Sequence, residues 1–101
     1  MSDGLAEQLR VLVEGEVRAM ARVLHPRVVL RRLDASEVHG REAVLEALVG
    51  GEHGAQHRVL DAVGDELRVE LRVPGVPGWL RFGLRGRAMA GRIVEVTVTA
   101  G

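Results

Sequence analysis

The stretch from Gln56 to Val73, QHRVLDAVGDELRVELRV, decides the fold. Its second half alternates strictly between charged and apolar side chains, which is the pattern of a half-buried β-strand. The dipeptide Gly64-Asp65 divides the stretch, and it is typical of a two-residue hairpin loop. The sequence therefore predicts two antiparallel strands, 56–63 and 66–73, that share one apolar and one charged face.

The two-residue loop also predicts which residues face each other across this hairpin. Asp61 comes to lie opposite Arg68 on the charged face. A regular register continued away from the loop places Arg58 opposite Leu71 and carries Gln56 to the same apolar side. We therefore expect Arg58 and Gln56 to project into the interior near one end of the sheet.

Two further strands follow and complete a meander. Residues 74–78 form a Pro- and Gly-rich turn, and apolar residues alternate again in 80–85 and in 94–98. A three-residue loop at 89–91 joins these two strands, because Gly91 suits a left-handed position. The expected interior wall consists of Leu67, Val69, Leu71, Leu80, Phe82, Leu84, Val94 and Val96.

The part of the chain before the meander is mainly helical. Apolar residues recur at helical spacing from 5 to 24, Gly15 predicts a bend in the middle, and Pro26 ends the helical part. Three segments follow: a strand at 27–33, an irregular polar stretch at 34–40 and an amphipathic helix at 41–49.

Composition indicates an ordinary small globular domain. The chain has 101 residues, of which 47% are hydrophobic and 28% charged, and no cysteine that could form a disulfide. Fourteen arginines balance fourteen acidic residues, which argues against a nucleic-acid partner. No apolar run approaches the roughly 20 residues of a membrane-spanning helix, and no signal peptide is visible. We expect a cytoplasmic protein that does not bind membranes.

The segment from Leu24 to Leu48, LHPRVVLRRLDASEVHGREAVLEAL, resembles a pattern of the NTF2-like (SnoaL-like, ketosteroid isomerase-like) superfamily. In that pattern a helix end, a strand and a polar stretch precede G-R-E-A-V, which opens the third helix. Gly91-Arg92-Ile93 is similar to the G-K-I that opens the last strand. The resemblance implies one α+β domain over 1–101, with helices packed on the concave face of a strongly curved antiparallel sheet, in the order α-α-β-α-β-β-β-β.

The resemblance also implies a ligand or active site in the cone between the sheet and the helices, and often a dimer through the sheet. Members of the family include steroid isomerases, polyketide cyclases and non-catalytic binding domains, so the fold does not select a function. We expect a small hydrophobic or polyketide-like ligand, a homodimer and no cofactor. If the domain is an enzyme, it would use acid–base chemistry without a metal.

His39 and Arg31 are the candidate catalytic residues. His39 precedes the glycine that opens the third helix, near the expected cavity mouth, where an imidazole can act as a base. Arg31 takes the position at which the resemblance places the general-base aspartate of ketosteroid isomerases, and a guanidinium there would stabilise an enolate. Each residue has a plainer interpretation: an exposed histidine, and an arginine that pairs with Glu37 or Asp34.

Four residues are candidate ligand contacts. Leu71 and Phe82 belong to the apolar wall, and Arg58 and Gln56 are expected beside it. A guanidinium in an apolar cone must be paired or must bind an anion, because an isolated buried charge is very costly. Arg58 therefore either holds a carboxylate- or enolate-bearing ligand or extends to the rim of the cone.

Trp79 offers an alternative function. It opens the third strand of the meander on the side opposite the apolar wall, so an exposed ring would indicate a non-catalytic interaction domain that uses the sheet face. A ring packed over the neighbouring proline turn would instead be structural. His53 and His57 have an H-x3-H spacing, but loop and strand are expected there, so we expect no metal site.

Overall fold

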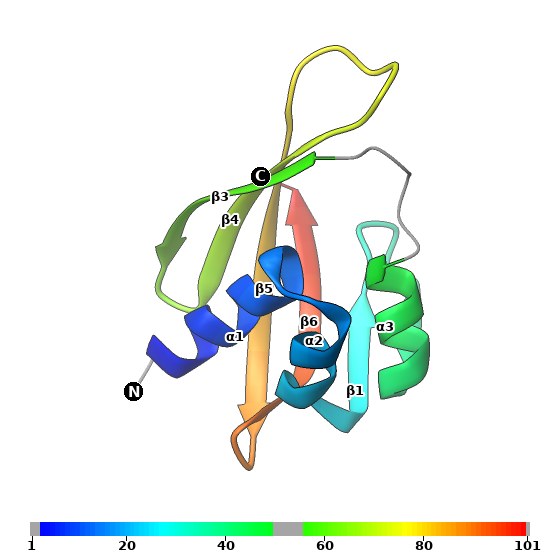
Figure 1. The fold of residues 1–101 in the computed structure, drawn as a ribbon, viewed down its shortest axis with the longest axis vertical. Helices are drawn as coiled ribbons and strands as arrows, with labels where there is room; N and C mark the ends of the chain where they lie inside the picture. Colours follow the sequence, from blue (N-terminus) through cyan, green and yellow to red (C-terminus); the bar gives the residue numbers. More distant parts are fainter. Residues whose placement is uncertain (1–2, 50–55, 101) are drawn as a thin grey trace.

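The computed structural model describes residues 3–49 and 56–100, and it contains helices and strands in the order that Figure 1 shows. The helices are α1 (Asp3–Glu14), α2 (Val17–Val23) and α3 (Arg41–Val49). The strands are β1 (Leu24–Arg31), β2 (Glu37–His39), β3 (Gln56–Val63), β4 (Glu66–Arg72), β5 (Leu80–Met89) and β6 (Arg92–Ala100).

The strands form one curved sheet in the order β2-β1-β6-β5-β4-β3, with the three helices packed against it (Figure 1). The meander β3-β4-β5-β6 is antiparallel throughout, as the sequence predicted. The expectation of a wholly antiparallel sheet is wrong in one place, because β1 pairs with β6 in parallel. The sheet is therefore mixed, and the fold is the predicted α+β architecture.

The polar stretch 34–40 is more regular than the sequence indicated, because it contains β2. A tight turn leads into this strand: Ala35 has a positive φ of 68°, and Asp34 accepts hydrogen bonds from the backbone N–H and the hydroxyl of Ser36. Both hydrogen bonds lower the pKa of Asp34, and the bond from the Ser36 hydroxyl has the larger effect. Such an Asx-type turn lets a polar segment return as a strand that pairs antiparallel with β1.

The predicted bend at Gly15 is present and separates α1 from α2. The Gly15 N–H still bonds to the carbonyl of Val11 at 2.8 Å, but Glu16 is extended and α2 begins only at Val17. A Cβ at Gly15 would lie 2.6 Å from the Val11 carbonyl oxygen, so the chain can turn here only with glycine. The bend directs the two short helices across the sheet.

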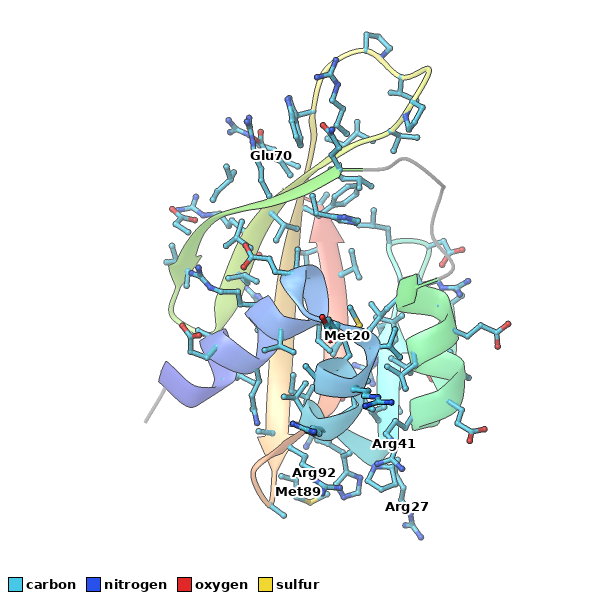
Figure 2. The ribbon with its side chains drawn as sticks, in the orientation of Figure 1. Met20, Arg27, Arg41, Glu70, Met89 and Arg92 are labelled. Carbon is cyan, nitrogen blue, oxygen red and sulfur yellow. The ribbon has the colours of Figure 1, made fainter. Side chains whose placement is uncertain are left out.

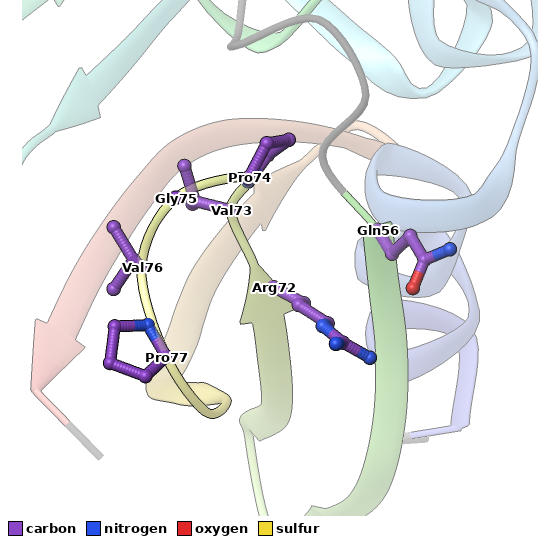
Figure 3. Close-up of a pocket in the computed structure, with 7 residues that line it drawn as sticks. All are labelled: Gln56, Arg72, Val73, Pro74, Gly75, Val76 and Pro77. Atoms are coloured by element: carbon purple, nitrogen blue, oxygen red, sulfur yellow. The ribbon is translucent and has the colours of Figure 1, made fainter.

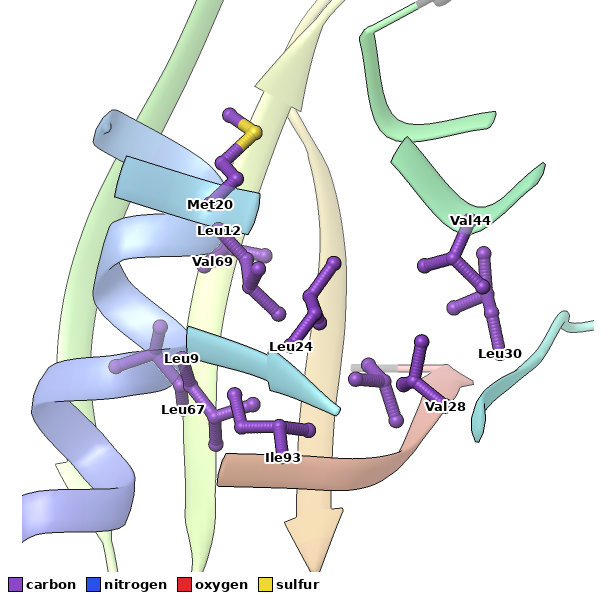
Figure 4. Close-up of a cluster of buried hydrophobic side chains, with 11 residues drawn as sticks. Leu9, Leu12, Met20, Leu24, Val28, Leu30, Val44, Leu67, Val69 and Ile93 are labelled. Atoms are coloured by element: carbon purple, nitrogen blue, oxygen red, sulfur yellow. The ribbon is translucent and has the colours of Figure 1, made fainter. Parts of the chain in front are cut away.

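Helix α1 packs closely on β5 at Gly86, where a Cβ would lie 3.0 Å from Leu9 and 3.2 Å from Leu5. Leu9 is fully buried there, near Leu67 and Ile93 (Figure 4). The last hairpin departs from the prediction in two ways: its loop has two residues, not three, because Met89 pairs with Arg92, and a bulge near Val94 buries Ile93 in place of Val94. The buried hydrophobic core consists of Leu9, Leu12, Met20, Leu24, Val28, Leu30, Val44, Leu67, Val69, Ile93 and Val96.

The hairpin β3–β4 keeps the predicted register near its loop and loses it at a β-bulge. Asp61 faces Arg68 as predicted, but the register shifts between Val59 and Asp61, so Leu60 has no partner on β4. Beyond the bulge Arg58 lies opposite Glu70, on the charged outer face of the sheet. The extra residue, Leu60, therefore reverses which side chains of residues 56–59 face inward and which face outward.

Candidate ligand-binding site

A cavity of about 620 Å³ lies between the α1–α2 bend and the concave face of the sheet. The helices contribute its roof from the end of α1, the bend and the start of α2, and α3 contributes Leu48. The sheet contributes its floor from β3, β4, β5 and β6. The lining residues are Leu12, Val13, Gly15, Glu16, Val17, Met20, Leu48, His57, Val69, Leu71, Phe82, Leu84 and Val98.

The floor is apolar because three neighbouring strands present their inward-facing positions side by side. Val69 on β4 lies opposite Phe82 on β5, and Leu84 on β5 lies opposite Val98 on β6. Leu71 extends this wall toward the end of β4. The structure therefore places Leu71 and Phe82, two of the predicted ligand contacts, in the cavity lining.

Two ionisable side chains, Glu16 and His57, are among the residues that line the cavity. Glu16 is there because it follows the bend at Gly15 and occupies the N-cap position of α2 in an extended conformation. His57 is there because the bulge in β3 places it opposite Leu71, on the concave side. A carboxylate and an imidazole can accept or donate a hydrogen bond or a proton at this otherwise apolar site.

Sequence reasoning missed both residues, and the cause differs between them. For His57, a regular register counted from the loop gave the opposite face, and no residue type in β3 marks the bulge. The sequence contained one signal against the regular register: that register places the Arg58 guanidinium on an apolar wall, where an unpaired charge is very costly. For Glu16, the signal was its position directly after the predicted bend.

Arg58 and Gln56 do not lie where they were expected. Arg58 is on the outer face, where its Nε donates to Glu70 Oε1 at 2.7 Å and its guanidinium stacks 4.1 Å from the centroid of the Trp79 ring. Gln56 lies opposite Arg72, also on the outer face. The prediction that both residues project into the cone is wrong, because the bulge turns them outward.

Glu70 is the centre of a compact cluster on that outer face. Its side chain is only 6% exposed, and it accepts bonds from Arg58 on β3 and from Arg81 Nε on β5 at 3.1 Å. The hydrogen bond from Arg58, and then that from Arg81, hold the pKa of Glu70 below its ordinary value, although burial opposes them. Trp79 is half-buried against Arg58, so its ring is engaged within the chain.

Arg31 is also on the outer face. Its Nε donates to Glu37 Oε2 at 2.9 Å, and its Nη1 lies 3.5 Å from Glu95 Oε1. The bond to Glu37 is the main cause of a raised pKa for Arg31. The plainer interpretation of Arg31, a pair with Glu37, is therefore confirmed, and its expected place in the cone is wrong because β1 presents Leu30, not Arg31, to the core.

His39 is exposed on β2, and its Nε2 lies 3.0 Å from Glu37 Oε1. The bonds from Arg31 and then from His39 lower the pKa of Glu37. His39 lies opposite Val29 and does not appear among the residues that line the apolar cavity. The expectation that it stands at the cavity mouth is wrong, because β2 turns its ring to the outer side.

Two other hollows lie away from the concave face. One is at the turn after β4, where Gln56 and Arg72 stand beside the segment 73–77 (Figure 3). The other is at the start of α3, beside Pro26 and His39. The first is at the end of the molecule that carries Glu70, opposite the β5–β6 hairpin with Met89 and Arg92 (Figure 2). The cavity on the concave face is lined by more apolar side chains than either hollow.

In residues 3–49 and 56–100, no three His, Asp or Glu side chains converge as a metal site requires. The histidine pair considered above includes His53, which lies outside the described residues. None of the helices in that same part of the chain is both long enough and apolar enough to cross a membrane.

Comparison with known proteins gives matches at the level of structure. No family model matches the sequence, and no curated protein matches it either. A ketosteroid isomerase candidate from Kribbella flavida superposes with a TM-score of 0.81 at 17% identity, over 98% of this chain and 78% of that chain. An NTF2-like protein of unknown function from Mesorhizobium loti gives a TM-score of 0.80 at 18% identity, over 99% of this chain and 93% of that chain.

A polyketide cyclase candidate from Pseudomonas putida gives a TM-score of 0.73 at 16% identity, over 96% of this chain and 91% of that chain. All three likenesses extend over nearly the whole chain, including the helices that roof the cavity and the strands that floor it. At these identities a likeness establishes architecture. The chain therefore has the NTF2-like fold, the α+β cone that its sequence predicted.

Proposed function

We propose that this domain binds a small, mainly apolar molecule in the cavity between the α1–α2 bend and the concave sheet. The observation that carries the proposal is the composition of the lining, which combines a continuous apolar wall with only two ionisable side chains. Small-molecule sites are typically concave, mostly apolar and provided with a few polar groups that fix orientation. A volume of about 620 Å³ is within the range of such sites.

In this proposal Leu71 and Phe82 contact the hydrocarbon part of the ligand, and His57 and Glu16 contact its polar end. A carbonyl, hydroxyl or enol oxygen would suit His57 as a donor, and a hydroxyl would suit Glu16 as an acceptor. The likeness to a polyketide cyclase candidate supports oxygenated polyketide-like compounds as the first class of ligand to test. If the domain is catalytic, these two side chains are the proton-transfer groups of the site.

The test uses the neutral fluorophore N-phenyl-1-naphthylamine, whose emission rises in apolar surroundings. We expect saturable binding to the wild-type chain. Val17→Phe should weaken binding at least about tenfold, because a phenyl group at this position of the lining occupies cavity volume. Val63→Phe is the matched control: both valines are about half exposed, at 49% and 54%, but Val63 lies on β3 outside the cavity.

Two results would contradict the proposal. One is the absence of saturable binding to a wild-type protein that melts cooperatively. The other is an equal loss of binding in Val17→Phe and Val63→Phe, since the probe would then not occupy the cavity.

A further inference from the structure

The sheet order leaves β3 at one edge, and among the described residues nothing pairs with its far side. The opposite edge is the three-residue β2, whereas β3 has eight residues and is exposed over most of its length. A long exposed edge strand is a template for pairing with another strand. We propose that two copies of this chain associate through β3, antiparallel across a two-fold axis between Val59 and Leu60, and form one continuous sheet.

The bulge makes β3 symmetric in the way that such pairing requires. On each side of the pair Val59–Leu60, the next three residues point in turn to the outer, the inner and the outer face of the sheet. Arg58 and Asp61 are outer, since they face Glu70 and Arg68, and His57 and Ala62 are inner, since they face Leu71 and Leu67. Antiparallel strands related by a two-fold axis must match face to face, and the shifted register gives this match.

The charged residues of β3 also complement those of a second, antiparallel β3. In the proposed pairing Arg58 of one copy lies opposite Asp61 of the second copy, and the same pair recurs across the axis. Within its own sheet Arg58 donates to Glu70, and Asp61 Oδ1 accepts a hydrogen bond from Arg68 Nε at 2.7 Å. Opposite charges across an edge favour pairing, whereas the like charges that usually guard an edge would prevent it.

The contact at the axis is apolar. Leu60, the bulged residue, is 44% exposed, and it would lie against Val59 and Leu60 of the second copy. Only Ala62 would stand opposite His57, so a small side chain adjoins the cavity residue of each subunit. A contact made through one edge strand is small for a specific interface, so we expect a reversible dimer.

Cross-linking tests the proposed axis directly, because the chain has no cysteine of its own. Leu60→Cys should give a disulfide-linked dimer on mild oxidation, since the two residues 60 lie diagonally across the axis and within reach of a disulfide. Leu33→Cys is the matched control, at a leucine that is 53% exposed in the turn before β2. If both variants cross-link at the same rate, the contact is random collision and the proposal fails.

Sedimentation velocity with charge variants tests the same axis without covalent chemistry. Leu60→Lys and Leu60→Glu should each shift the protein to monomer, because like charges meet at the axis, and an equimolar mixture should recover the dimer. Leu33→Lys should associate like the wild type. A wild-type chain that stays monomeric up to its solubility limit, or a dimer that Leu60→Lys leaves unchanged, would overturn the proposal. Neither result depends on whether the cavity binds a ligand.

Discussion

At the scale of single residues, Glu70 shows how the outer face of the sheet is held together. Its carboxylate is nearly inaccessible, and it joins three strands through Arg58 on β3 and Arg81 on β5. A buried carboxylate with two guanidinium partners is stabilising only while it is ionised, because a neutral group would leave both arginines without a counter-charge. The same cluster fixes Trp79 through Arg58.

This arrangement predicts how stability depends on pH. The folded pKa of Glu70 is lowered, chiefly by the bond from Arg58. The stabilisation is therefore fully present above the ordinary glutamate pKa of about 4.3, and it is lost as the pH falls through the folded value. Thermal melts from pH 7 to pH 3 should show a falling midpoint below about pH 4.

Glu70→Gln should lower the melting temperature at pH 7 and flatten part of this acid-side slope. Glu46→Gln, at an exposed position on α3, serves as the control and should retain the wild-type profile. Equal slopes for wild type and Glu70→Gln would show that the cluster contributes nothing to acid sensitivity.

At the scale of elements, the bulge in β3 decides which side chains enter the cavity. Without it, Arg58 would face the apolar wall; with it, His57 takes that place and Arg58 pairs with Glu70. A single unpaired residue costs less than an unpaired guanidinium in an apolar cavity. The bulge therefore resolves a conflict between the register set by the hairpin loop and the charges along the strand.

Deleting Leu60 should remove the bulge and keep every other residue of β3 opposite its present partner on β4. We expect a folded protein that melts within a few degrees of the wild type. Deleting Ala62 is the matched control, because a regular register would then bring Asp61 onto the apolar face opposite Leu67 and separate it from Arg68. That variant should be clearly less stable, and equal melting temperatures would contradict the pairing described here.

The same strand shows how far sequence reasoning reached. Alternation from Glu66 to Arg72 correctly assigned the two faces of β4, and the loop correctly gave the pair of Asp61 with Arg68. Both signals are local. The bulge at Leu60 depends on the balance between distant pairs, such as Arg58 with Glu70, so two of the predicted cavity residues, Arg58 and Gln56, were misplaced while Leu71 and Phe82 were not.

At the scale of the whole molecule, one core joins the helices to both halves of the sheet. Leu9 is fully buried in it and packs against Gly86 of β5. Leu9→Ala should lower the free energy of unfolding by about 2–5 kcal/mol, the range for truncating a buried leucine. Leu33→Ala, at an exposed leucine, should change it by no more than about 0.5 kcal/mol. Denaturant unfolding measures both, and a similar loss in the two variants would show that α1 is not part of the cooperative core.

The bend at Gly15 has a consequence for how this molecule can diversify. The floor of the cavity is fixed by ladders of hydrogen bonds, but its ceiling consists of two short helices joined at an extended residue. Substitutions along that ceiling can enlarge, narrow or tilt the chamber while the strands below keep their partners. Selection can therefore alter what the chamber admits without having to rebuild the molecule around it.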